Sequence, residues 1–411
     1  MAVDITTLTR EADSGDLDTQ FQLGDLYENG LGVPVDMGQA AYWYRKAAEN
    51  GYVKAQTKLG QMYIKGQGVP EDHTEAVNWL EKAANNDDPS AQASLAWCYQ
   101  QGMGTEKNIQ HAFNWYMRAA EHGHAGARYN LGYMYANGYG IDRDDSEALK
   151  WYQKAADQGH MKAQLNAGLM YVQGLGTEVN LKAGANMYLS AAKQGYAKAQ
   201  YNLGLMYAGG HGVDQNDKEN FFWQEKAAQQ GYARAQFNLG LLFTHGLGTE
   251  QDYDKAVYWF RKAASQHYSK AYYQLGKMYA KGLGVEANEI ESAKYYRLSA
   301  ESGYAKAQYR LGRLYDKGTG VKQDYDKGAE WYKKSARQGN TRAQYVLGVH
   351  YAKGKGVKKN YMKAYTWLLL ACDEENSIYR DILNKVKTRL TEQEYTNAVN
   401  RSREIRDQYH Q

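Results

Sequence analysis

Ten consecutive stretches of this 411-residue chain follow one 36-residue template, with no residue inserted or deleted between them. A Leu-Gly pair marks the same register in eight copies, from Leu23-Gly24 to Leu347-Gly348, while Leu95-Ala96 and Ala167-Gly168 occupy it in the other two. A self-similar period of this length is typical of repeat proteins in which each unit packs only against its neighbours. The period therefore predicts an array of similar units rather than a set of independent globular domains.

Each copy is expected to hold two helices joined by a glycine turn. In the first helix, apolar residues such as Leu23 and Tyr27 recur at a spacing that places them on one face. A glycine follows this helix in every copy, beginning with Gly30, as a left-handed helix stop requires. The second helix starts in every copy at aspartate or asparagine, beginning with Asp36, whose side chain can accept hydrogen bonds from the free amides of a helix start.

The second helix carries its own buried face, in which Ala40, Trp43 and Tyr44 have helical spacing. The chain has 42 glycines and only 3 prolines, which fits helices separated by glycine turns rather than disorder. Seven copies end with a glycine such as Gly51, but Asn-Asn-Asp-Asp-Pro at 85–89 replaces it in one copy, and His267 in another. We interpret these departures as drift that a redundant array tolerates, with a hinge or a partner contact as the alternative.

The combined pattern, as in Ala197 to Val213 and Asp252 to Ala264, resembles the Sel-1-like repeat, a family of tetratricopeptide-like helical hairpins. The resemblance covers residues 17–372. It implies an all-α fold, a right-handed αα superhelix or solenoid of ten 36-residue helix-turn-helix repeats forming one domain. Residues 1–16 look like the second helix of a worn copy and are expected to form an N-terminal helical cap. Residues 373–411 resemble the helices that close such arrays and are expected to form a C-terminal cap.

No motif in the sequence predicts catalysis. The paired glycines are not a phosphate loop, because no Gly-Lys-Ser/Thr follows them and their repetition has a structural cause. His122 and His124 could clip a metal ion, but no cysteine or carboxylate cluster accompanies them, so we interpret them as exposed turn residues. Cys98 and Cys372 stand where other copies have small or apolar residues, which predicts buried free thiols. We therefore expect no enzyme activity, no cofactor, no metal site and no small-molecule substrate.

Positions that vary between copies are more informative about function. On the first helix, positions 18, 21, 25 and 29 and their equivalents lie on one side, because steps of three or four residues return to the same face. The first of these rows carries a cation in six successive copies: Lys162, Lys198, Arg234, Lys270, Lys306 and Arg342. With neighbouring helices about 8–10 Å apart, these cations are expected to form a ladder.

The other rows change character along the chain. The second row is apolar in the middle of the array and then cationic: Trp97, Tyr133, Leu169, Leu205, Leu241, Lys277 and Arg313. The third row contributes aromatic residues, among them Tyr129, Tyr201 and Phe237, and the last row turns basic at Lys281 and Lys317. In the Sel-1-like family this side lines the concave surface. The resemblance thus implies a groove that is apolar and aromatic at its centre and cationic toward its C-terminal end.

Such a groove predicts a non-catalytic scaffold or adaptor for a protein partner that offers an acidic segment and hydrophobic anchors. The resemblance implies the same, because Sel-1-like repeat proteins are adaptors in assembly, signalling and host contact. It also implies a second class, since some bacterial members are cognate immunity proteins, stoichiometric inhibitors of a secreted toxin such as a lipase-type effector. A structural alternative stays open: neighbouring first helices could bury these residues laterally and leave the lysines as a solvated rim.

Nucleic acid or anionic lipid is a less favoured ligand for the cations. The net charge is only +4, and the tyrosines follow the template instead of forming a stacking platform. The longest apolar run, Trp367 to Cys372, is too short to cross a bilayer, and the start from Met1 to Gly15 has no secretory hydrophobic segment. The sequence thus predicts no membrane span and a cytoplasmic location, or a periplasmic or secreted one if Met1 opens a mature chain.

Overall fold

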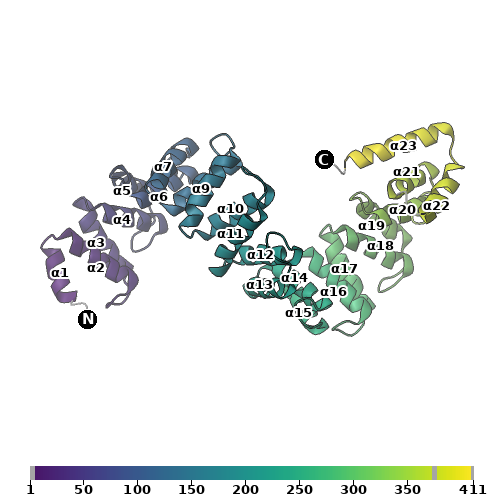
Figure 1. Ribbon diagram of the computed structural model, residues 1–411, viewed down its shortest axis with the longest axis horizontal. Helices are drawn as coiled ribbons and strands as arrows, with labels where there is room; N and C mark the ends of the chain where they lie inside the picture. The colour runs from purple at the N-terminus through teal and green to yellow at the C-terminus, as the bar shows by residue number, and fades with distance from the viewer. Residues whose placement is uncertain (1–4, 373–376, 409–411) are drawn as a thin grey trace. The chain divides into compact units, whose positions relative to one another are not determined.

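The computed structural model describes residues 5–372 and 377–408, and every regular element in these ranges is a helix (Figure 1). The first helices of the repeats are α2 (Leu17–Asn29), α4 (Val53–Lys65), α6 (Pro89–Gln101), α8 (Ala125–Asn137), α10 (Met161–Gln173), α12 (Ala197–Gly209), α14 (Ala233–His245), α16 (Ser269–Lys281), α18 (Ala305–Lys317) and α20 (Thr341–Lys353). The second helices are α3 (Met37–Glu49), α5 (His73–Asn85), α7 (Ile109–Glu121), α9 (Asp145–Asp157), α11 (Leu181–Lys193), α13 (Asp217–Gln229), α15 (Tyr253–Ala264), α17 (Glu289–Glu301), α19 (Tyr325–Ala336) and α21 (Tyr361–Ala371). The predicted all-α solenoid is confirmed.

The chain divides into two compact units. The N-terminal unit comprises Met1–Met206 and Gly210–Asp214, and the C-terminal unit comprises Tyr207–Gly209 and Gln215–Gln411. Within each unit, consecutive helices pack against each other, for example α8 on α9 in the first and α16 on α17 in the second. Each repeat therefore rests on its sequence neighbours, which is what the 36-residue period predicts.

Three further helices flank the repeats: α1 (Ile5–Asp13), α22 (Ser377–Lys387) and α23 (Glu392–Asp407). Ala12 of α1 is buried against Leu23 of the first repeat. Val386 of α22 and Ala398 of α23 are buried in one cluster with Leu368 of α21. The expected caps also include residues 1–4, 373–376 and 409–411, which lie outside the described residues.

The turn between the two helices of a repeat follows from close backbone approach. α4 ends at Gly66, which takes the left-handed conformation with φ 62°. Two residues later, a Cβ on Gly68 would collide with the carbonyl oxygen of Met37 in the preceding repeat. α5 then begins at Asp72, whose carboxylate accepts a hydrogen bond of 3.0 Å from the amide of Glu75. Both glycines and the capping residue are thus required by local geometry.

The Leu-Gly marker has a packing cause. Leu131 of α8 is fully buried, and a Cβ on Gly132 would come within 2.6 Å of the ring of Tyr152 on α9. The glycine lets the two helices approach, and the tyrosine fills the space that it leaves. The expected buried face of the second helix is also confirmed, since Trp43 and Tyr44 are both buried.

A buried glutamine joins most repeats to the helix before them, and the sequence did not predict this contact. The Gln92 amide donates a hydrogen bond of 3.1 Å to the carbonyl oxygen of Ala84. The same bond is made by Gln20, Gln56, Gln164, Gln200, Gln236, Gln308 and Gln344. Arg128 makes it in the fourth repeat, with its Nε 3.0 Å from the oxygen of Ala120. Because a buried amide needs a partner, this bond helps to fix how successive repeats stack.

The two copies without a terminal glycine keep the backbone conformation that glycine would adopt. Asp87 has φ 57° and His267 has φ 59°, in the left-handed region that L side chains rarely occupy. At the equivalent place in neighbouring repeats, Gly123 and Gly231 also have positive φ. The sequence drift at these two turns therefore leaves the turn geometry intact and stores backbone strain.

Candidate partner-binding surface

We use the term variable face for the side of the first helices that carries positions 18, 21, 25 and 29 of the template. In the N-terminal unit, four large apolar side chains on this face are exposed: Trp97 at 37%, Tyr133 at 44%, Leu169 at 41% and Leu205 at 41%. They occupy the same position on α6, α8, α10 and α12, and we call them the apolar row. Recurrence of an exposed apolar residue in four successive repeats sets this surface apart from the scattered apolar residues of an ordinary surface.

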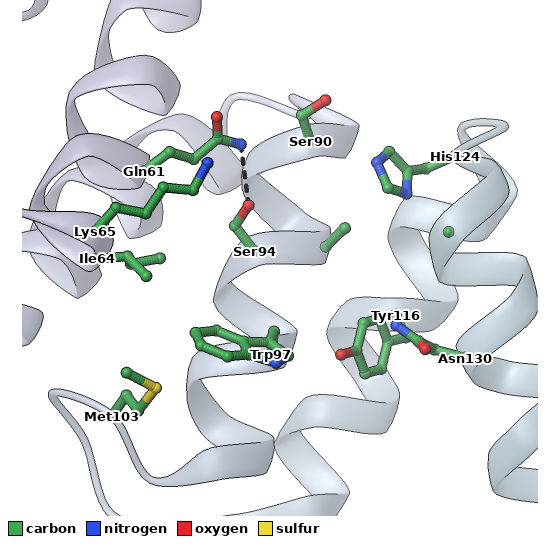
Figure 2. Close-up of a pocket in the computed structure, with 12 residues that line it drawn as sticks. Gln61, Ile64, Lys65, Ser90, Ser94, Trp97, Met103, Tyr116, His124 and Asn130 are labelled. Carbon is green, nitrogen blue, oxygen red and sulfur yellow. Dashed lines mark hydrogen bonds between the residues drawn. The ribbon is translucent and has the colours of Figure 1, made fainter. Parts of the chain in front are cut away.

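A cavity of about 680 Å³ opens beside Trp97. Its walls come from α4, α6, α7 and α8, with Trp97 between Ile64 on one side and Asn130 on the other (Figure 2). The exposed wall is mostly apolar, and two of its polar side chains, Gln61 and Ser94, are joined by a hydrogen bond of 3.2 Å (Figure 2). A largely apolar hollow with a few polar groups is the usual character of a site that receives a partner's side chain.

His124, at the edge of this cavity, is not the exposed turn residue that the sequence suggested. It is half-buried and caps α8, because its Nδ1 accepts a hydrogen bond of 3.1 Å from the amide of Ala127. His160 caps α10 in the same way. Burial lowers the pKa of His124, partly opposed by Asp88, and burial and Lys162 lower the pKa of His160. A neutral ring is what the cap requires, since a protonated nitrogen cannot accept a hydrogen bond.

The aromatic row of Tyr129, Tyr201 and Phe237 lies deeper. Phe237 is only 9% exposed, with its ring centroid 5.8 Å from that of Phe260 and 5.2 Å from that of Tyr268, which directly precedes the next first helix, α16. Tyr129 is half-buried and stacks on His160 at 4.8 Å. Lateral packing between repeats therefore accounts for Phe237 and much of Tyr129, whereas it does not bury the apolar row.

The remaining predicted residues are ten cations, Tyr201 and Leu241, and the structure places them as follows. Exposed are Lys162, Lys198, Arg234, Lys270, Lys281, Lys306, Lys317 and Arg342, while Tyr201, Leu241, Lys277 and Arg313 are half-buried. The six ladder cations are each the second residue of a first helix. Within residues 5–372 and 377–408, none of the six forms an ion pair with a carboxylate.

This placement runs against the helix dipole. The first turn of a helix favours aspartate or glutamate and disfavours a cation by a few tenths of a kcal/mol up to about 1 kcal/mol. The first helices from α4 to α20 nevertheless have no acidic residue in their first turn. The variable face therefore starts, repeat after repeat, with a positive helix end and often with a cation on it.

Positive charge is densest in the C-terminal unit, on α16 and α18. Burial lowers the pKa of Lys277, and the neighbouring cations Lys281, Arg310 and Lys306 lower it further. Arg310 was not predicted as a site residue. At its position other copies have mainly asparagine, glutamine or serine, and that departure from the template is the signal that could have identified it.

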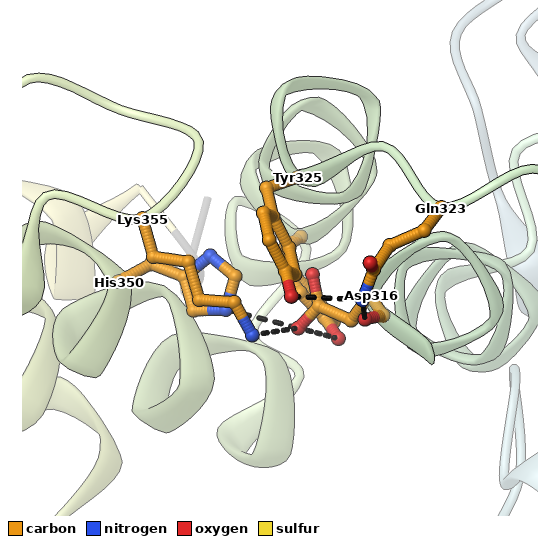
Figure 3. Close-up of polar contacts among 6 residues, drawn as sticks. Asp316, Gln323, Tyr325, His350 and Lys355 are labelled. Carbon is orange, nitrogen blue, oxygen red and sulfur yellow. Dashed lines mark hydrogen bonds and ion pairs between the residues drawn. The ribbon is translucent and has the colours of Figure 1, made fainter. Parts of the chain in front are cut away.

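A carboxylate close to this cluster is occupied by internal partners. Asp316 Oδ2 lies 3.0 Å from His350 Nε2 and 3.8 Å from Lys355 Nζ, and it accepts a hydrogen bond from the Tyr332 hydroxyl (Figure 3). Gln323 donates a hydrogen bond of 2.8 Å to the Asp316 carbonyl oxygen (Figure 3). His350 is only 3% exposed and stands where most other repeats have methionine or leucine. Asp316 thus forms a polar pair with His350 inside the stack of repeats.

The two cysteines are free thiols. Cys98 is buried, and burial raises the pKa of its thiol to about 11, whereas Cys372 is half-buried rather than buried as expected. Among the residues that the structure describes, no three His, Cys, Asp or Glu side chains are grouped to hold a metal ion. In the same ranges, no helix combines the length and the apolar character that a bilayer crossing needs.

Comparison with known proteins gives a consistent family match. The Sel1 repeat model matches residues 17–52, 53–88, 89–124, 125–160, 162–196, 197–232, 233–268, 269–304, 305–340 and 341–376. A protective antigen of uropathogenic Escherichia coli strains, c5321, which displays an SLR fold, is 32% identical over 99% of this chain and 95% of its own, with a TM-score of 0.68. A Sel1 repeat protein from Oxalobacter formigenes is 31% identical over 84% of this chain and 89% of its own, with a TM-score of 0.60. No curated protein sequence matches the chain.

Proposed function

Because the chain belongs to the Sel1 repeat family, we propose that it is a non-catalytic scaffold that holds a protein partner on its variable face. The observation that carries the proposal is the apolar row beside the Trp97 cavity. Tryptophan and tyrosine, the types of Trp97 and Tyr133, are among the residues that dominate binding energy at protein interfaces. Exposed apolar residues on four successive helices offer one continuous strip for such a contact.

The partner's chemistry follows from the cations that border this strip. Lys162 and Lys198 stand on α10 and α12, the helices that also carry Leu169 and Leu205. Since these cations have no carboxylate partner among the described residues, an acidic segment of the partner would supply the missing charge. We therefore propose a partner with hydrophobic anchors next to acidic residues, bound by an adaptor rather than by an enzyme.

A capture experiment tests the proposal. The variant Tyr133→Ser, Leu169→Ser, Leu205→Ser removes three members of the apolar row and is expected to lose the partner that the wild-type protein captures from its source cell. The matched control is Tyr42→Ser, Phe222→Ser, Tyr258→Ser, which removes three apolar residues of similar exposure from second helices. Circular dichroism checks that both variants stay helical. Equal capture by the first variant and the wild type would overturn the proposal.

The same purification separates the adaptor from the second candidate, an immunity protein that inhibits a toxin. An inhibitor is expected to give one tight complex of fixed stoichiometry that survives size-exclusion chromatography and suppresses an enzymatic activity of the partner. An adaptor is expected to give several partners that exchange more readily. The triple serine variant of the apolar row should weaken either kind of complex. It therefore tests whether the variable face binds the partner, whichever of the two functions the protein has.

A further inference from the structure

A second cavity, of about 370 Å³, lies in the C-terminal unit between α16, α18 and α20. Three of its lining residues are cations, Lys306, Arg310 and Arg342, and none is a carboxylate. The other walls are Tyr273, Tyr309 and the start of α20 at Thr341. The amides in the first turn of a helix have no partner within the helix, so the end of α20 adds positive potential to the cavity.

Arg310 distinguishes this cavity from the rest of the ladder. It is half-buried, whereas the ladder residues Lys306 and Arg342 are exposed. Burial lowers the pKa of Arg310, but Tyr273, whose side chain is hydrogen-bonded to it, raises the pKa together with Tyr296 and Tyr309, and the net shift is upward. A guanidinium that is fixed by burial and by an adjacent hydroxyl is pre-organised for a ligand with several oxygen atoms.

Nearby acidic residues do not neutralise the cluster. Glu289 lines a smaller adjoining cavity together with Arg310, Arg313 and Lys317, but it is exposed and forms no ion pair with a described residue. Burial lowers the pKa of Lys277, and the nearby cations Lys281, Arg310 and Lys306 lower it further, as like charges that lie close together do. A ligand that carries more than one negative charge would relieve this repulsion better than a single carboxylate.

We propose that this cavity binds a phosphoryl group on a side chain of the partner's acidic segment, so that phosphorylation of the partner strengthens its binding. The inference rests on the proposed scaffold function, because Lys306 and Arg342 belong to the same variable face. A phosphorylated side chain carries nearly two charges and three acceptor oxygens, which matches two arginine forks and one lysine. A single carboxylate would leave part of this donor set unused.

Fluorescence anisotropy with the full chain tests the inference on three labelled peptides that differ at one central residue. Each peptide has glutamates and leucines around phosphoserine, glutamate or serine. The phosphoserine peptide is expected to bind about tenfold more tightly than the serine peptide, as one added charge-assisted contact implies, with the glutamate peptide between them. In the variant Arg310→Gln, the three peptides are expected to bind alike. Glutamine already occupies this position in two other copies, at Gln22 and Gln274, so the fold should tolerate it.

The control Arg297→Gln removes the same charge from an exposed position on α17 and should leave the preference for phosphoserine intact. Equal affinity for all three peptides would overturn the phosphoryl site while leaving the acidic-partner proposal standing. Loss of the preference for phosphoserine in both Arg310→Gln and Arg297→Gln would mean that the preference is a general charge effect. That result would also overturn the phosphoryl site. Binding of inorganic phosphate or of phosphatidate vesicles, but not of the phosphopeptide, would assign the cavity to another phosphate source and overturn the proposed partner. Failure of every peptide to bind would count against both proposals.

Discussion

The N-terminal and C-terminal units fill one template position with different chemistry. At the ninth residue of the first helix, α6, α8, α10 and α12 of the N-terminal unit have the apolar row of Trp97, Tyr133, Leu169 and Leu205. In the C-terminal unit, α16 and α18 have Lys277 and Arg313 there, between Leu241 on α14 and Val349 on α20. The residues that form the repeat are the same in both units, because Leu131 and Leu311 are equally buried two residues before the variable position. Stability and recognition therefore reside on different residues of the same helix.

A pair of substitutions on α8 tests most directly whether stability and recognition depend on different residues. Leu131→Ala removes a fully buried side chain and is expected to lower the free energy of unfolding by about 2–5 kcal/mol. Tyr133→Ala, two residues away and 44% exposed, is expected to change it by less than about 0.5 kcal/mol. Guanidinium unfolding followed by circular dichroism measures both. Similar losses would show that the apolar row belongs to the core, contrary to the proposed function.

A smaller effect is expected at the polar pair of Asp316 and His350 in the C-terminal unit. His350→Met restores the residue type of other repeats but leaves Asp316 without its closest buried partner, so a loss of about 3 kcal/mol is expected. The double variant Asp316→Ala, His350→Met restores the template at both positions, since Ala280 stands one repeat before Asp316 and Met278 stands two repeats before His350. This double variant should recover most of the lost free energy of unfolding or be more stable than the wild type.

The unfolding midpoints of the two single variants, the double variant and the wild type form a complete cycle. Additive losses in the double variant would mean that the histidine and the carboxylate do not stabilise each other. That result would make His350 a further case of drift, like the two turns without glycine, rather than a compensated pair.

Each unit also contains one strained turn, and the two turns should respond unequally. His267→Gly, in the C-terminal unit, relieves a left-handed conformation and is expected to stabilise the protein by about 1 kcal/mol. Asp87→Gly should gain less, because aspartate tolerates this conformation better and because Gln92 donates a hydrogen bond of 3.4 Å to its carboxylate. Thermal unfolding of both variants checks the order, and Gly231→Ala is the matched reverse change. A loss of stability in His267→Gly would show that its side chain contributes more than the strain.

Much of the fold could be predicted from the sequence because the template repeats every residue that the geometry requires. Gly68 recurs in all ten copies and the position of Asp72 is always aspartate or asparagine, so one local argument applied to all of them. The variable face was predictable as a set of rows, but the depth of each residue was not. Phe237 and Leu205 both look like groove residues in the sequence, yet Phe237 packs against Tyr268, which directly precedes the next first helix, α16. That contact depends on how repeats stack, and periodicity within one helix does not contain it.

The missed residues share a physical cause. Arg310, His350 and His124 act through partners in a neighbouring element, namely Tyr273, Asp316 and the amide of Ala127. A departure from the template was visible at each position, but its meaning required the partner's location. For His124 the signal was present in Asp16 and Asn340, capping residues at the same register in other copies.

The smallest predicted effect concerns these capping histidines, which only the N-terminal unit has. The pKa of His124 and of His160 is held below the ordinary value of 6.5 in the folded chain. As the pH falls below about 6.5, the unfolded chain takes up protons that the folded chain does not, so stability is complete above that pH and declines below it. The variant His124→Asn, His160→Asn keeps both caps, as Asn340 does for α20, and removes this titration.

Unfolding midpoints at about pH 7.5 and pH 5.5 should therefore fall less in the asparagine variant than in the wild type. At the higher pH the wild type and the asparagine variant are expected to have the same unfolding midpoint, because a neutral imidazole and an asparagine amide both accept the capping hydrogen bond. Hydrogen exchange should place the acid-sensitive change in α8 and α10, since the C-terminal unit has tyrosine or asparagine at that register, from Tyr268 to Asn340. An equal acid response in both proteins would mean that the two caps stay formed when the histidines are protonated, and the difference between the units would then lie only in their variable faces.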